Sequence, residues 1–208
     1  MIGCVNEIGK RQKADNVSGL LGESGFREYM NQLDTPLETG YLLRIGIDHF
    51  KEINDNFGQE YGDFVLRKTA DCISGCISEV QKVYKLVADE FLILDVSSDE
   101  VKDADKLYDK VRNEIDRFIE SNEFKVIYTV SGGIVPFAAL KGNQCSEALK
   151  LTDFALNEAK KLGRNRCYIF NGETYRKFLR KREITQELRE AVINGFQGFT
   201  AFYQLYLL

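Results

Sequence analysis

The sequence predicts an α+β fold with a mixed, mostly antiparallel central sheet flanked by helices. Segments with apolar residues at helical spacing alternate with short apolar segments that are typical of strands. Two strand-like segments follow each other directly, and this hairpin interrupts the alternation, which predicts a mixed rather than a parallel sheet. The length of 208 residues allows one such domain with its own core and a short extension.

The first half of the chain predicts a helix over 19–33, a strand over 41–48, a short helix over 49–58 and a longer helix over 61–80. The first of these ends before Pro36, because the residue preceding a proline is pushed away from helical geometry. Gly58 ends the short helix. In the longer helix, apolar side chains recur near the helical period, so one face should be buried.

The second half predicts strands over 83–88 and 90–96, a helix over 100–121, a helix over 146–163 and a closing strand over 165–170. Between the helices, residues 124–137 read either as a strand pair or as one long bent strand with glycines at its middle. This order fits a ferredoxin-like core with additions, in which helices cover both faces of one sheet.

The two ends of the chain differ from this central domain, which we place at 15–172. Residues 1–14 are polar and are expected to form a linker. Residues 173–195 predict a charged helix, and 198–208 read as a strand. This C-terminal part, 173–208, is expected to lead from a linker helix into a second domain.

Composition excludes several classes of function. The formal net charge is −4 and charges of both signs are interspersed, which argues against nucleic acid or a membrane surface as a partner. No apolar segment is long enough to span a membrane, and the first residues lack the core of a signal peptide. The sequence therefore predicts a soluble protein.

Cysteine usage indicates a reducing compartment. There are five cysteines with spacings unlike those of a zinc site, and only one histidine is present. Reduced thiols in the core of a cytoplasmic protein are the favoured interpretation.

An acidic pair, Asp89 and Glu90, lies between two apolar segments of the predicted hairpin. Carboxylates at such a position suit a hard divalent cation. They equally suit a polar hairpin tip between two buried strands, and the pair by itself leaves both interpretations open.

Four separated motifs together resemble one family. They are DNVSGL at 15–20, IDHFKEINDNFGQEYGDFVL at 47–66, KLVADEF at 85–91 and AKKLGRN at 159–165. In this order and at these separations they are similar to the GGDEF domain of bacterial diguanylate cyclases, with the resemblance covering roughly residues 12–170. It implies a nucleotidyl-cyclase-like version of the predicted fold.

The resemblance also implies an activity and its partners. Family enzymes condense two GTP molecules into cyclic di-GMP, with the 3′-hydroxyl of one nucleotide attacking the α-phosphate of the other. Divalent ions such as Mg²⁺ neutralise the phosphates. Because each domain holds one GTP, the reaction requires two domains face to face, and a homodimer is the simplest arrangement.

Two residues stand at the positions that read guanine in the family, Asn54 and Asp63. An amide and a carboxylate can match the donors and acceptors on the edge of guanine. Asn54 could instead cap a turn, and Asp63 could be an acid at a helix N-terminus. The shared register of the motifs favours nucleotide binding.

The phosphate-binding positions fall at two other places. Backbone N–H groups of His49 and Phe50, beside Lys51 at a helix start, form an expected phosphate cradle. The His49 side chain itself is interpreted as a surface or loop group. Lys160 and Arg164, expected one helical turn apart, match the family's phosphate-binding pair, although they also fit a solvated basic helix end.

The metal-binding positions depart from the family pattern. Asp89 is retained, but the second metal carboxylate of the family is replaced by Gly46. Asp48 cannot substitute, because two residues along a strand shift a group by about 6–7 Å. Val87 and Ala88 replace the glycine pair of the motif, and valine is poorly suited to a positive φ. Asp89 and Glu90 are therefore predicted to be the remnant of a catalytic metal site.

The C-terminal segment carries a second, shorter resemblance. LREAVINGFQGFTAFYQL is similar to the opening of an EAL phosphodiesterase domain, with Leu188, Ala191, Tyr203 and Gln204 matching. We expect a degenerate GGDEF domain that binds GTP and regulates an adjoining EAL domain in the same full-length chain, with little or no cyclase activity. The alternatives are an active diguanylate cyclase and a ligand-free structural or dimerising scaffold.

Overall fold

The structure is a computed structural model, and it describes residues 14–33, 37–98, 100–121, 125–142 and 145–196. The chain divides into two compact units, residues 1–170 and 171–208. The strand-like segment expected at 198–208 lies outside the described residues. None of the described helices combines the length and the apolar character that a membrane span needs.

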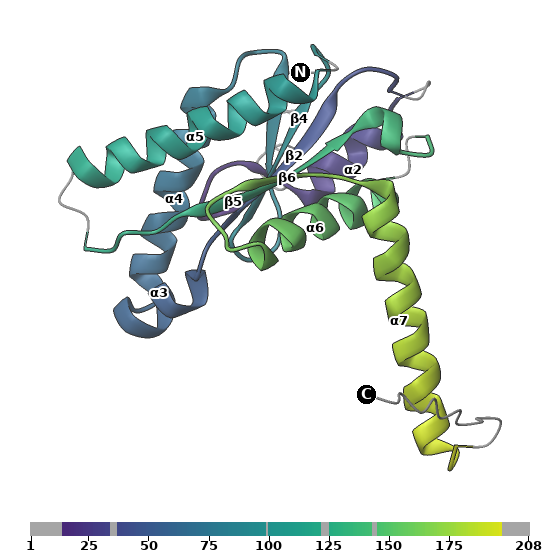
Figure 1. The fold of residues 1–208 in the computed structure, drawn as a ribbon. Helices are drawn as coiled ribbons and strands as arrows, with labels where there is room; N and C mark the ends of the chain where they lie inside the picture. The colour runs from purple at the N-terminus through teal and green to yellow at the C-terminus, as the bar shows by residue number, and fades with distance from the viewer. Residues whose placement is uncertain (1–13, 34–36, 99, 122–124, 143–144, 197–208) are drawn as a thin grey trace, which may run out of the picture. The chain divides into compact units, whose positions relative to one another are not determined.

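A six-stranded sheet forms the centre of the first unit, in the order β1-β3-β4-β2-β5-β6 (Figure 1). The strands are β1 (Leu21–Gly22), β2 (Tyr41–Ile47), β3 (Gln81–Lys85), β4 (Glu90–Asp95), β5 (Val130–Pro136) and β6 (Cys167–Ile169). The central pairs β3–β4, β4–β2 and β2–β5 are antiparallel, whereas the outer pairs β1–β3 and β5–β6 are parallel. The predicted mixed, mostly antiparallel sheet is confirmed.

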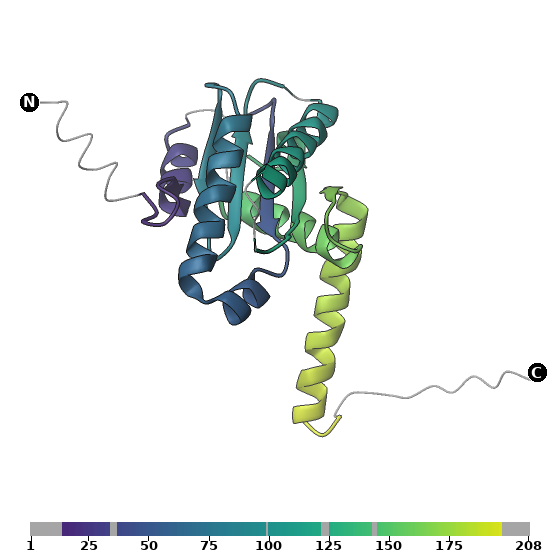
Figure 2. The ribbon, with the colours of Figure 1, turned by 90° about the vertical axis from the view of Figure 1, so that its left-hand side faces the viewer.

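Helices cover both faces of this sheet (Figures 1 and 2). They are α2 (Glu23–Asn31), α3 (Phe50–Phe57), α4 (Gln59–Cys76), α5 (Val101–Ser121) and α6 (Cys145–Lys161). Residues of α4 and α5 pack with alternate residues of β2 in one buried cluster, while α2 and α6 contribute to a second cluster on the other face. A short 3₁₀ helix, η1 (Phe137–Ala139), follows β5.

Several boundaries differ from the predicted ones. Leu21 belongs to the two-residue strand β1, so the first helix begins only at Glu23. The long helix α4 ends at Cys76, four residues early, because Ile77 adopts an extended backbone. Within the described residues 125–137 the structure has one strand, β5, and not the strand pair that was one of the two expectations.

Two glycines in β5 set how closely the helices approach the sheet. A Cβ at Gly132 would come within 3.0 Å of the Tyr108 ring on α5. A Cβ at Gly133 would overlap the backbone of α6 at Ala155 and Leu156. Because adjacent strand residues face opposite sides of a sheet, these glycines let α5 and α6 pack tightly on the two faces. The second contact fixes the position of α6 above β5 and β2.

The second unit contains the predicted charged helix, α7 (Gly172–Ile193). Asn171 caps its N-terminus, because its side-chain oxygen accepts hydrogen bonds from the backbone N–H groups of Glu173 and Thr174 at 3.0 Å each. Its side chains are mostly exposed, and Ala191 is the buried one among its described residues.

Candidate nucleotide site

The corner between α3 and α4 brings Asn54, which the sequence predicts to read guanine, against the backbone of α4. Gly58 joins the two helices at φ 83°, and its N–H donates to the Asn54 carbonyl oxygen at 2.9 Å. A Cβ at Gly62 would overlap the Asn54 side-chain oxygen, so the amide lies directly on the glycine. The Asn54 Oδ1 atom is buried and has no hydrogen-bond partner within the described residues. Asn54 therefore caps no turn through its side chain.

Asp63 follows Gly62 and is half-buried. It is the fifth residue of α4, whose first-turn acid is Glu60, so Asp63 does not stabilise the helix N-terminus. In the part of the chain that the structure describes, its carboxylate makes no hydrogen bond or ion pair. Asn54 thus supplies an unused acceptor against Gly62, and Asp63, the residue after Gly62, supplies an unused carboxylate.

The expected phosphate cradle lies at the N-terminus of α3. His49 precedes the helix in a left-handed conformation, with φ 57°, and Phe50 is the first helical residue. The first N–H groups of a helix have no intrahelical partner, and the positive end of the helix dipole favours an anion there. Lys51 is exposed in the first turn, as a phosphate-binding side chain requires.

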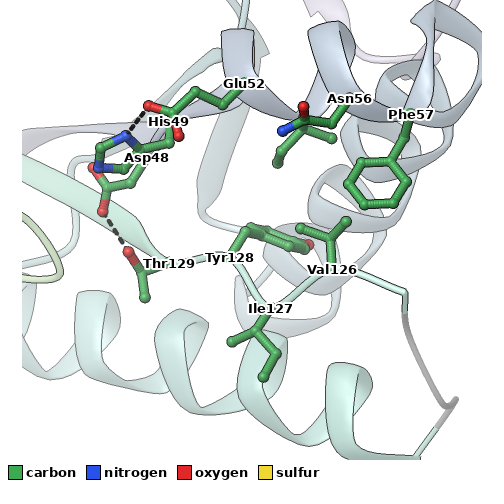
Figure 3. A pocket seen from close by; sticks show the side chains of 10 residues that line it. Asp48, His49, Glu52, Asn56, Phe57, Val126, Ile127, Tyr128 and Thr129 are labelled. Carbon is green, nitrogen blue, oxygen red and sulfur yellow. Dashed lines mark hydrogen bonds and ion pairs between the residues drawn. The ribbon is translucent and has the colours of Figure 1, made fainter.

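The His49 side chain lines a cavity of about 340 Å³ between α3 and the segment before β5 (Figure 3). Its Nδ1 atom lies 2.6 Å from Glu52 Oε1, and both side chains are exposed. The prediction of a loop-type histidine agrees with this placement.

Asp48 holds two of the motifs together. Its buried carboxylate accepts hydrogen bonds from Thr129 Oγ1 and Ser131 Oγ, each at 2.7 Å, and from the Asn165 backbone N–H at 3.1 Å. Because these three donors satisfy its carboxylate, Asp48 is a structural link between the start of α3 and the segment after α6. It is not placed to serve as the missing metal ligand.

The turn between β3 and β4 has four connecting residues, 86–89. Ala88 carries the positive φ, at 55°, whereas Val87 does not. The Lys85 ammonium is buried and donates to the carbonyl oxygens of Leu86, at 3.0 Å, and Ala88. Burial lowers the pKa of Lys85, which the nearby carboxylates oppose. Val87 and Ala88 are the exposed residues of this turn, whereas Asp89, the last turn residue, and Glu90, the first residue of β4, are half-buried.

Asp89 and Glu90 turn inward to basic groups. Arg44 donates from Nε to Glu90 Oε2 at 2.7 Å and adds a second, shorter contact from Nη2. The Lys160 ammonium lies 4.0 Å from Asp89 Oδ2 and 3.9 Å from Glu90 Oε1. Burial raises the pKa of Asp89, Lys160 lowers it and Glu90 raises it again, with a net upward shift.

The residues around Gly46 do not fit a divalent cation. Gly46 pairs with Glu90 across β2 and β4, and a Cβ there would lie 3.0 Å from Lys160 Nζ. No group of three or more histidine, cysteine, aspartate or glutamate side chains suitable for a metal occurs within the described ranges. Asp89 is the remaining ligand position, and an ammonium faces it in place of a second carboxylate.

Arg164 does not share a helical turn with Lys160, contrary to the sequence-based expectation. Helix α6 ends at Lys161, and Gly163 and Arg164 follow with φ values of 116° and 60°. The Arg164 N–H closes the helix end by donating to the Ala159 carbonyl at 3.2 Å. The Arg164 side chain is exposed, whereas Lys160 points to the acidic pair.

The sequence-based prediction did not include two residues of this region, Arg44 and Lys85. A signal for Arg44 exists, because it is the one charged residue within the apolar segment 41–47. A charge inside a core strand requires a buried partner. Lys85 similarly interrupts the apolar segment 83–88.

The chain belongs to the GGDEF family: a model described as "Diguanylate cyclase, GGDEF domain" matches residues 13–166. The protein is 30% identical over 161 residues to the Escherichia coli diguanylate cyclase DgcZ, covering 76% of this chain and 53% of DgcZ. It is 27% identical over 183 residues to the Pseudomonas aeruginosa cyclic di-GMP phosphodiesterase NbdA, covering 86% of this chain and 23% of NbdA.

A solved structure shows the same fold. The coiled coil and GGDEF domain of DgcB from Caulobacter crescentus, in complex with c-di-GMP, matches with a TM-score of 0.68 at 21% identity. The match covers 80% of this chain and 90% of that chain. The present chain thus spans about a quarter of NbdA and about half of DgcZ.

Proposed function

We propose that this GGDEF domain binds GTP as a regulatory module of a cyclic di-GMP signalling protein and has little or no cyclase activity. The observation that carries the proposal is the buried Oδ1 atom of Asn54, which has no hydrogen-bond partner among the described residues. A buried acceptor without a partner costs about 1–3 kcal/mol, so its retention is explained by a ligand that donates to it.

The phosphate side of the site supports the same ligand. The N-terminus of α3 offers backbone N–H groups at His49 and Phe50, with Lys51 exposed beside them. Arg164 is exposed as well and is free to reach a phosphate. Guanine at Asn54 and phosphates at the start of the same helix would place the nucleotide along the first five residues of α3.

Catalysis is disfavoured by the hairpin. The cyclase reaction relies on divalent cations at the phosphates. Here Gly46 supplies no carboxylate for a metal ion, and the Glu90 carboxylate is already hydrogen-bonded to Arg44. A bound nucleotide would then act without turnover. It would favour the state of the protein that binds it more tightly, to the extent that its affinities for the two states differ.

The adjoining partner in this proposal is an EAL domain after residue 208. The resemblance of 188–204 to an EAL opening motivates it, and the similarity to the phosphodiesterase NbdA is in keeping with it. A cytoplasmic location accords with Cys72, Cys76, Cys145 and Cys167, which are unpaired.

A calorimetric titration of the 208-residue chain with GTP and Mg²⁺ tests the proposal, with ATP as the control nucleotide. We expect saturable GTP binding, no comparable ATP binding, and loss of GTP binding in Asn54→Ala and Asp63→Ala. No GTP binding at millimolar concentration would overturn the proposal and leave a scaffold.

Cyclase activity is measured separately, by chromatography after incubation with GTP and Mg²⁺ or Mn²⁺. We expect no cyclic di-GMP above the background of Asp89→Ala. Product formation that depends on Asp89 would show instead an active cyclase with an altered site.

A further inference from the structure

The acidic pair at the hairpin already has side-chain cations as partners. Arg44 and Lys160 face Asp89, Glu90 and Asp153 there, and the buried Lys85 is attracted to Asp15 as well as to Asp89 and Glu90. The Arg44 side chain is 11% exposed and reaches Asp153 Oδ1 at 3.5 Å as well as Glu90. A divalent cation added beside the Arg44 and Lys160 side chains would bring like charges together in a half-buried site.

Lys160 owes its position to the packing of α6. Gly133 lets the backbone of α6 at Ala155 and Leu156 touch β5. Lys160 lies one helical turn after Leu156, on the same side of the helix. A Cβ at Gly46 would meet Leu156 Cδ2 at 3.1 Å and Lys160 Nζ at 3.0 Å. The Lys160 ammonium therefore lies over Gly46, the position at which the family has a metal-binding carboxylate.

We propose that the Lys160 ammonium replaces the divalent cation as the counter-charge of Asp89 and Glu90, so that this domain binds no Mg²⁺ or Mn²⁺ at the hairpin. Its consequence for the ligand, which rests on the proposed function, is that GTP binds without a metal ion. The nucleotide is then held through its base and through protein cations.

Physical size explains why the ammonium and the metal exclude each other. A divalent cation binds carboxylate oxygens at about 2.0–2.6 Å, and it requires several oxygen ligands. The Lys160 nitrogen stands 3.9–4.0 Å from two of those oxygens, and Arg44 holds another at 2.7 Å. Entry of a metal would require Lys160 to leave, because the metal and the ammonium would otherwise be like charges in contact.

A metal titration without nucleotide tests this inference on the full 208-residue chain. The melting temperature is followed against Mn²⁺ for the wild type and for the double variant Gly46→Asp/Lys160→Met, which restores the carboxylate and removes the ammonium. We expect no shift for the wild type, and for the double variant an increase of about 3 °C at a Mn²⁺ concentration ten times its Kd.

Either of two results would overturn the inference. One is stabilisation of the wild-type protein by submillimolar Mn²⁺ that Asp89→Ala abolishes. The other is the absence of a Mn²⁺ response in the folded double variant, since the ammonium and the glycine would then not be what excludes the metal.

Lys160→Met and Lys161→Met form a matched pair for the counter-charge role. Lys161 is the next residue on α6, 61% exposed, and pairs with Glu158 at 2.6 Å. We expect Lys160→Met to lower the melting temperature by several degrees more than Lys161→Met at neutral pH. Equal effects would contradict a charge-balancing role for Lys160.

A GTP titration in Mg²⁺ and in EDTA separates this inference from the proposed function. Equal affinity within about twofold supports metal-free binding, whereas an affinity more than tenfold higher with Mg²⁺ overturns it. If GTP binds under neither condition, the regulatory proposal fails, and the Mn²⁺ titration alone decides the role of Lys160.

Discussion

Two regions of this domain have kept family residues in different physical states. At the corner of α3 and α4, Asn54 and Asp63 retain polar groups that the fold leaves unpaired. At the β3–β4 hairpin, Asp89 and Glu90 are retained too, but Arg44 and Lys160 pair with them. A motif residue that the fold satisfies internally has less need of a ligand than one that it leaves unpaired.

The difference separates binding from catalysis within one site. In the proposed function, guanine recognition depends on the corner, whereas metal-assisted phosphoryl transfer would depend on the hairpin. Substitutions in one region should therefore change GTP affinity or fold stability without changing the other region, and this expectation can be tested.

Arg44→Met should have the largest effect, because it leaves Glu90 half-buried without its main partner. We expect the free energy of unfolding to fall by about 2 kcal/mol in urea denaturation. Arg27→Met removes an exposed pair with Glu23 and should cost less than about 0.5 kcal/mol. GTP affinity should stay within about twofold in both variants, and a large loss of it in Arg44→Met would mean that the two regions are coupled.

Gly62→Ala should affect the corner selectively. A Cβ there displaces the Asn54 amide, and we expect GTP affinity measured by calorimetry to fall about tenfold, or 1.4 kcal/mol. Gly75→Ala on the same helix has nothing within 4 Å of its Cβ, and should stabilise the fold by up to about 1 kcal/mol without changing affinity. Unchanged GTP affinity in Gly62→Ala would remove Asn54 from the binding site.

Ala88→Gly should stabilise the hairpin by about 1 kcal/mol, because Ala88 holds a φ of 55° that glycine adopts without strain. Thermal unfolding measures the change. Val87→Gly is the matched control, since Val87 has no positive φ, and it should bring no gain. A stabilising Val87→Gly would show that the turn has a different geometry.

Asp89→Asn should produce the smallest effect, visible in the pH dependence of stability. Burial raises the pKa of Asp89 above 3.8, so the folded state holds this proton more tightly than the unfolded state does. Its favourable contribution is fully present below pH 3.8 and is lost as pH rises through the folded-state pKa. The variant should therefore lose less stability than the wild type between pH 3.8 and neutrality, and a steeper loss would contradict the burial argument.

The order of helices and strands was predictable because each segment carries its own apolar period. The ends of the helices and strands were less predictable. The sequence places Leu21 in a helix, whereas its position in β1 depends on pairing with Tyr84 of β3. The missing carboxylate at Gly46 and the retained Asn54 and Asp63 could also be identified from the sequence, through their register in the family motifs.

By itself, the sequence determined the family, the sheet with its flanking helices and the loss of one metal ligand, because these follow from local patterns and motif register. Only the tertiary structure decided what fills the gap at Gly46. Lys160 lies 114 residues further along the chain and reaches the hairpin because Gly133 admits α6 against β5. Arg44 meets Glu90 through the pairing of β2 with β4. Contacts between segments so far apart depend on packing, which no local pattern contains.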